Sequence, residues 1–125
     1  MRICVDLDGV ICKLKKKDQL YSDLKPIEGA IEKIKELKKN GHYVIIYTAR
    51  RMKTHSSNQG KLIKDIGKIT LDWLDKYKIE YDEIYFGKPW ANIYIDDNGF
   101  RFSDWDSISG NGTSLPSSNE SSINL

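Results

Sequence analysis

The sequence predicts a single α/β domain, a Rossmann-like three-layer fold with a mainly parallel sheet and no large cap domain. Short apolar runs rich in β-branched residues alternate along the chain with stretches whose apolar residues recur at helical spacing. This alternation is typical of a parallel sheet covered on both faces. With 125 residues, of which 39% are hydrophobic, the chain can build one core and little more.

The first half of the chain provides two strands and one helix. The apolar run at 3–7 predicts a buried strand. Apolar residues at helical spacing over 27–37 predict a helix, which Pro26 opens and the Asn-Gly pair at 40–41 closes. Residues 42–50, HYVIIYTAR, predict the second buried strand. These elements form one strand–helix–strand unit.

The second half repeats the pattern and adds further strands. A polar loop without periodicity over 51–60 precedes an apolar stripe that predicts a helix over 62–77. Strands are expected at 81–87 and 91–97, with a short fifth strand at 100–105. The parallel sheet would therefore contain at least four strands.

The ends of the chain and its bulk composition limit the class of protein. We expect a catalytic domain over 1–106 and a flexible tail over 107–125, which is rich in Ser, Asn and Gly. A net charge of +2, from 20 basic and 18 acidic residues, is too mild for a dedicated nucleic-acid binder. No signal peptide or membrane span is predicted, so the protein is expected to be soluble and cytoplasmic. Two cysteines are too few for a disulfide framework.

Four predicted strands lead into polar or charged residues at their carboxyl ends. In a parallel sheet these ends meet at one edge, where ligands bind. We therefore expect two carboxylate pairs, a hydroxyl and an ammonium group to converge on one site. These residues are, in chain order, Asp6, Asp8, Thr48, Lys88, Asp96 and Asp97.

This combination of groups suits the transfer of a phosphoryl group. A phosphate ester is repelled by the Asp6 carboxylate, so a hard divalent cation, for which Mg²⁺ is the first candidate, is expected to bridge the two. Lys88 and the Thr48 hydroxyl would neutralise or hydrogen-bond the remaining phosphoryl oxygens. Asp8 is placed to protonate the leaving oxygen and later to deprotonate water. Gly9 would let the backbone turn sharply beside the ligand.

The segments DLDGV, YTAR, GKPW and IYIDD resemble the four ordered motifs of the haloacid dehalogenase superfamily of phosphatases. The resemblance covers residues 3–97. Longer stretches, including YTARRMKTHSSNQGK and YDEIYFGKPW, are similar to the small capless subfamily of capsule biosynthesis phosphatases. The resemblance implies an Mg²⁺-dependent hydrolase.

The resemblance also implies a role for each motif residue. Asp6 is the expected nucleophile and Asp8 the general acid and base, with Thr48 and Lys88 completing the catalytic set. The metal ligands are expected among Asp6, Asp8, Asp96 and Asp97. The expected substrate-binding residues are Gly9, Thr48, Ala49, Arg50, Lys88 and Trp90. Trp90 either forms a wall of the pocket or simply packs against its neighbours.

The spacing of the motifs leaves no room for a cap domain. One helix with its loops fills the interval from Asp8 to Thr48, and another fills the interval from Thr48 to Lys88. The site should be open, or closed only by residues 13–24, by residues 50–60 or by the partner subunit of a homo-oligomer. The loop over 50–61 is either an ordinary solvated loop or contacts a phosphate or acidic sugar through its basic residues, which are Arg50, Arg51, Lys53, His55 and Lys61.

The leading hypothesis is a phosphomonoesterase that acts through an aspartyl-phosphate on a small phosphorylated metabolite, such as a sugar precursor of a capsular polysaccharide. Within the same chemistry, the alternative substrate is the 3′-phosphate of a nucleotide or polynucleotide. A receiver domain of signal transduction is an alternative from another class. That alternative requires an acceptor aspartate at the end of the third strand, and here this strand ends in Tyr-Phe-Gly.

Overall fold

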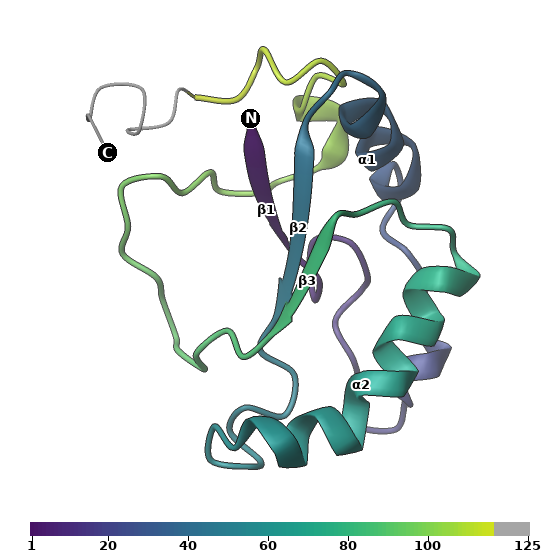
Figure 1. Cartoon of the computed structure of the whole chain (residues 1–125), viewed down its shortest axis with the longest axis vertical. Helices are drawn as coiled ribbons and strands as arrows, with labels where there is room; N and C mark the ends of the chain where they lie inside the picture. Colours follow the sequence, from purple (N-terminus) through teal and green to yellow (C-terminus); the bar gives the residue numbers. More distant parts are fainter. Residues whose placement is uncertain (117–125) are drawn as a thin grey trace.

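The computed structural model describes residues 1–116 and contains a parallel sheet of three strands in the order β1–β2–β3 (Figure 1). β1 spans Arg2–Asp6, β2 spans Tyr43–Thr48 and β3 spans Glu83–Phe86. All three strands therefore end on the same side of the molecule. The fold class predicted from the sequence is confirmed as a small Rossmann-like α/β domain without a large cap.

Two helices connect the strands. α1 spans Ala30–Lys39 and α2 spans Gln59–Lys76, and both lie on the right of the sheet in Figure 1. The Asn58 side chain starts α2 by accepting a hydrogen bond from the backbone N–H of Lys61 at 3.0 Å, which satisfies a helix-terminal donor. Two short 3-10 helices, η1 over Tyr21–Asp23 and η2 over Trp105–Ser107, complete the regular structure of residues 1–116.

The core forms where alternate strand residues meet the apolar stripes of the helices. Val5, Val44 and Ile46 are buried, and they pack in the same cluster as Ile34 of α1 and Leu74 of α2. Because side chains alternate between the faces of a strand, their neighbours point to the opposite side of the sheet. The helices thus cover one face, and in Figure 1 the segment that follows β3 runs along the other side.

That segment differs from the sequence prediction. Residues 87–104 contain neither a helix nor a strand, so the strands expected at 91–97 and 100–105 are not formed. In Figure 1 the chain swings away from the sheet after β3, and β1 keeps an unpaired edge within the described sheet. Alternating apolar residues show that a segment can become a strand, but a strand also needs a partner backbone.

The segment that follows η2 also differs from expectation. Ile108 is buried in the main core and Leu115 packs against it, so the described part of the expected flexible tail belongs to the domain. Trp105 is 2% exposed, and its indole N–H donates to the carbonyl of Val10 at 2.8 Å. The apolar side chains of this segment hold it against the core. Residues 117–125 lie outside the described part of the chain.

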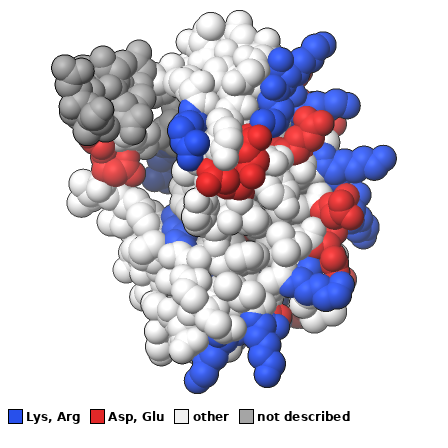
Figure 2. Space-filling model, viewed as in Figure 1, with Lys and Arg blue, Asp and Glu red and all other residues white. Residues whose placement is uncertain are grey.

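The surface is polar over the helices. Figure 2 shows basic and acidic side chains interspersed on the right of the molecule, over α1 and α2, while much of the lower left surface carries no charge. Among the described residues, no helix is long and apolar enough to cross a lipid bilayer.

Candidate active site

The carboxyl ends of β1 and β2 and the loop after β3 place three of the predicted residues close together. Asp6 is the last residue of β1, and Thr48 is the last residue of β2. The backbone N–H groups of Gly87 and Lys88 both donate to the carbonyl of Thr48 at 3.1 Å, which fixes Lys88 beside the end of β2. The backbone hydrogen bonds of the sheet therefore fix the backbone positions from which these side chains project.

Asp6 and Lys88 form an ion pair at this edge. The Lys88 Nζ lies 2.8 Å from the Asp6 Oδ2 and 4.3 Å from the centre of the Tyr94 ring. Burial raises the pKa of the Asp6 carboxyl above its ordinary value, and Lys88 offsets only part of that increase. Burial lowers the pKa of Lys88, but its hydrogen bond to Asp6 and the Asp6 charge outweigh burial, so its pKa is raised. The pair thus joins a firmly charged ammonium to a carboxylate that is poorly solvated.

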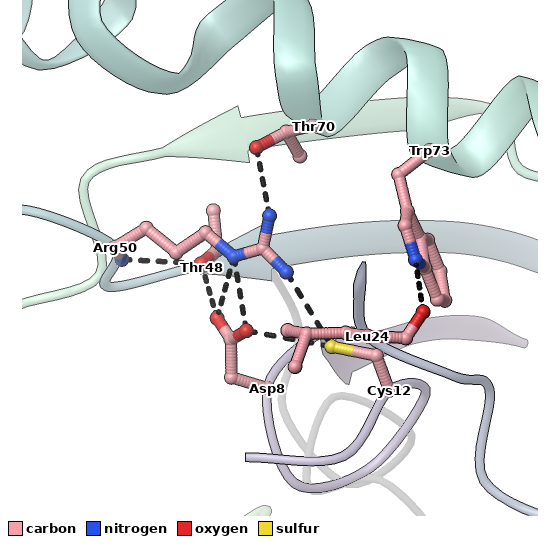
Figure 3. Close-up of polar contacts among 7 residues, drawn as sticks. All are labelled: Asp8, Cys12, Leu24, Thr48, Arg50, Thr70 and Trp73. Atoms are coloured by element: carbon pink, nitrogen blue, oxygen red, sulfur yellow. Dashed lines mark hydrogen bonds and ion pairs between the residues drawn. The ribbon is translucent and has the colours of Figure 1, made fainter. Parts of the chain in front are cut away.

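Asp8 lies in a separate and denser cluster of polar contacts (Figure 3). The Thr48 hydroxyl donates to its Oδ2 at 2.8 Å, and the Arg50 Nε donates to both carboxylate oxygens, at 2.9 and 3.2 Å. The Cys12 thiol donates to its Oδ1 at 3.4 Å. The Thr48 hydroxyl, which the sequence predicts to bind the phosphate, therefore holds Asp8 in this structure.

Arg50 is almost completely inaccessible, with 1% of its side chain exposed. Its Nη1 donates to the Thr70 hydroxyl at 3.0 Å, and its Nη2 donates to the Cys12 sulfur at 3.4 Å. The Tyr21 ring covers the guanidinium, whose central carbon lies 4.2 Å from the ring centre. The expectation that Arg50 binds substrate is not met here, because each of its side-chain nitrogens already has a partner within the protein.

The turn after β1 brings Asp8 and Cys12 together. Gly9 has φ +88°, which favours glycine, and its N–H donates to the carbonyl of Cys12 at 2.8 Å. Burial and the nearby Asp8 charge raise the pKa of the Cys12 thiol to about 12, so it stays protonated at neutral pH. The sharp turn predicted at Gly9 is therefore present and supports the cluster around Asp8.

The remaining expected substrate contacts lie farther out. Trp90 is 57% exposed, and the Lys53 Nζ lies 4.5 Å from the centre of its ring. Ala49 is half-buried and packs against the small cluster that contains Met52. In the same loop His55 contacts Asp65 at 2.9 Å. Trp90 and Lys53 therefore face solvent rather than closing the site.

The second acidic pair does not join the first. Asp96 and Asp97 are exposed, and the Asp96 carboxylate accepts a hydrogen bond from the backbone N–H of Asn98 at 2.9 Å. Within residues 1–116, no group of three or more His, Cys, Asp or Glu side chains could hold a metal ion. The expected Mg²⁺ site is therefore not complete in this arrangement, because no strand carries residues 96–97 to the edge of the sheet.

Three residues of the cluster are not among the site residues expected from the sequence, namely Cys12, Tyr21 and Thr70. Thr70 does carry a recognisable signal, since it is a polar residue within the apolar stripe of α2 and is fully buried. A buried hydroxyl requires a hydrogen-bond partner, and here that partner is Arg50. Cys12 and Tyr21 carry no comparable signal in the sequence.

Comparisons with known proteins identify one clear similarity. The structure resembles the crystal structure of a target protein from Vibrio cholerae with a TM-score of 0.73. The two sequences are 38% identical over 81% of this chain and 84% of that chain. No protein-family model and no curated protein matches the chain.

Proposed function

The chain belongs to the same family as this Vibrio cholerae protein, and we propose that it is a phosphomonoesterase that uses Asp6 as its nucleophile. One observation carries the proposal. A poorly solvated carboxylate paired with a lysine lies beside a second carboxylate that three donors hold in place, at the edge of a parallel sheet where ligands bind. The resemblance to the haloacid dehalogenase superfamily supports the same assignment.

In the first step, the Asp6 carboxylate attacks phosphorus and the bond between phosphorus and the ester oxygen breaks. Lys88 holds a phosphoryl oxygen, and its charge offsets the repulsion between Asp6 and the incoming dianion. Asp8 gives its proton to the leaving oxygen, so that an alcohol and an aspartyl-phosphate on Asp6 are formed.

In the second step, water attacks the phosphorus of the aspartyl-phosphate. Asp8, now a carboxylate, takes a proton from this water, and the bond between phosphorus and the Asp6 oxygen breaks. Inorganic phosphate leaves, and Asp6 is restored as a carboxylate. Asp8 is then protonated, as the next first step requires.

The proposed Mg²⁺ requirement depends on the second acidic pair. Asp6 and Asp8 supply two carboxylates, and the described residues add no third His, Cys, Asp or Glu side chain beside them. Asp96 and Asp97 would complete the site if residues 91–97 paired with the free edge of β1. The open edge and the alternating apolar pattern of that segment support this arrangement.

The proposed substrate is a small phosphorylated metabolite. The absence of a large cap leaves room for a leaving group of any size, and the exposed Trp90 and Lys53 lie beside the loop that carries Lys88. The resemblance to capsule biosynthesis phosphatases favours a sugar phosphate that serves polysaccharide synthesis. A nucleotide 3′-phosphate is the alternative.

Phosphate release from a panel of sugar phosphates, polyol phosphates and nucleotides tests the proposal. We expect turnover with Mg²⁺, none with EDTA, and none for Asp6→Asn under either condition. Asp72→Asn is the matched control, because Asp72 lies on the exposed side of α2 and pairs with Lys68 at 2.6 Å. Full activity in EDTA would contradict the metal assignment, and no release from any ester by the wild-type protein would contradict the function.

A further inference from the structure

The guanidinium of Arg50 lies between the Asp8 carboxylate and helix α2 (Figure 3). Its Nε donates to both oxygens of Asp8, and its other two nitrogens are held by Thr70 and Cys12. We infer that Arg50 is a positioning residue, which aims the Asp8 carboxyl group at the leaving oxygen and stabilises the carboxylate that proton transfer creates. This inference rests on the proposed function.

The burial of the two partners differs in a way that fits this role. The Arg50 side chain is 1% exposed, whereas the Asp8 side chain is 22% exposed. Arg50 therefore contacts Asp8 from the protein interior and leaves part of the carboxyl group accessible at the edge of the sheet. The exposed part of Asp8 is therefore open to a substrate, while Arg50 lies behind it in the interior.

The cost of burial also argues that Arg50 does more than fill space. Taking a guanidinium out of water is expensive, and a buried ion pair is often no more stabilising than apolar residues of the same volume. Arg50 recovers part of that cost through three fixed partners and the face of Tyr21. These contacts also hold the guanidinium in one orientation, whereas a solvated arginine can adopt many.

The chemistry of the first step explains what the orientation provides. When Asp8 releases its proton to the leaving oxygen, a negative charge develops on Asp8. The Arg50 Nε and the Thr48 hydroxyl already lie at hydrogen-bonding distance from its two oxygens, so no rearrangement is needed at that moment. The benefit is largest when the leaving oxygen is a poor leaving group that needs the proton.

The dependence on the leaving group gives a readout that a purely structural role would not change. Phosphate release from 4-nitrophenyl phosphate, a good leaving group, and from phenyl phosphate, a poorer one, is measured for wild type, Arg50→Gln and Arg50→Lys. We expect Arg50→Gln to lower kcat roughly 100-fold on phenyl phosphate and much less on 4-nitrophenyl phosphate, with KM nearly unchanged. Arg50→Lys should restore little, because a single ammonium cannot reach all three partners.

Two further variants keep the test decisive. Arg2→Gln is the matched control, because Arg2 pairs with Glu83 on the exposed surface at 3.0 Å and should show wild-type kinetics on both esters. Thr70→Val removes only one partner of Arg50 and keeps the charge, so it should show the same dependence on the leaving group at smaller amplitude. Thr70→Val therefore still tests the inference if Arg50→Gln fails to fold.

The outcomes separate the inference from the function on which it rests. Equal loss on both esters, or a rise in KM alone, would overturn the positioning role while the phosphatase activity of the wild type stands. If wild-type protein releases phosphate from neither these esters nor the substrate panel, the proposed function fails and the role of Arg50 fails with it.

Discussion

Two regions of the molecule carry pairs of aspartates, and the structure treats them differently. Asp6 and Asp8, at the end of β1, are joined to Lys88, Thr48 and Arg50 by contacts of 2.8–3.2 Å. The pair at 96–97 belongs to a segment without regular structure, in which every residue from 91 to 100 is exposed. The first pair is held in place by neighbouring polar side chains at the edge of the sheet, and the second pair is exposed.

The difference shows what backbone pairing contributes to a site. The β1–β2 pairing places Asp6 opposite Tyr47, so the ends of both strands have fixed positions before any side chain is considered. Within the described residues the segment at 91–97 forms no strand pairing, and its Ile93 and Ile95 are 64% and 95% exposed. Because β1 has an open edge and this segment has unburied apolar side chains, pairing of the two would satisfy both.

Substituting either aspartate of the first pair should have the largest effect on phosphatase activity. Asp6→Asn removes the attacking carboxylate, so we expect a loss of roughly 10⁴-fold or more on any ester. Asp8→Asn keeps the nucleophile but cannot activate water. With 4-nitrophenyl phosphate, it should release about one equivalent of phenol in a burst and then stall. Rapid-mixing absorbance measures this burst, and a burst from Asp6→Asn would reverse the roles.

Substitution of the second pair tests whether it joins the first. If residues 91–97 pair with β1 when Mg²⁺ binds, Asp96→Asn and Asp97→Asn should each raise the Mg²⁺ concentration needed for activity. The increase should be at least the roughly 10–100-fold that loss of an outer-shell partner of a metal ligand causes. Hydrogen exchange of the amides at 91–97 should also slow when Mg²⁺ and inorganic phosphate are added to the wild-type protein. Exchange that stays fast and a Mg²⁺ requirement that stays unchanged would keep the second pair outside the site.

Two tryptophans extend the comparison to stability, one packed against the turn after β1 and one in the segment that leads to the second aspartate pair. Trp105 is buried and donates to Val10, whereas Trp90 is exposed beside Lys53. We expect Trp105→Ala to lower the free energy of unfolding by about 3 kcal/mol, and Trp90→Ala to leave it almost unchanged. Urea denaturation measures both. Equal effects would show that the segment carrying Trp90 packs more tightly than the structure indicates.

The smallest effect concerns the thiol within the Asp8 cluster. Cys12 is fully buried with a pKa raised to about 12, so an aromatic disulfide reagent near neutral pH should modify the exposed Cys4 and spare Cys12 until the protein unfolds. Because the folded pKa is raised from 9.0, the stabilising contribution of the neutral thiol is complete below pH 9 and is lost as the pH rises toward 12. Rapid modification of both thiols would show that the cluster opens readily.

The sequence by itself predicted the three strands that form, the two helices, and the position of Asp6, Thr48 and Lys88 at one edge of the sheet. Apolar runs and helical periodicity predicted β1, β2, β3, α1 and α2, because burial of one face imposes a local pattern on each element. The convergence of Asp6, Thr48 and Lys88 followed from a general property of parallel sheets, whose strand ends share one edge. None of these predictions required knowing which residues touch.

The tertiary structure was needed for every feature that depends on contacts between segments far apart in the chain. Arg50 could be read as a substrate ligand until the structure placed it between Asp8 and Thr70, which are 42 and 20 residues away from it in the chain. The alternating pattern at 91–97 could not show whether a partner strand is available, because a strand is stabilised by hydrogen bonds to another backbone. The packing of Ile108 was hidden for the same reason, since one apolar residue in a polar stretch reveals nothing about the core it joins.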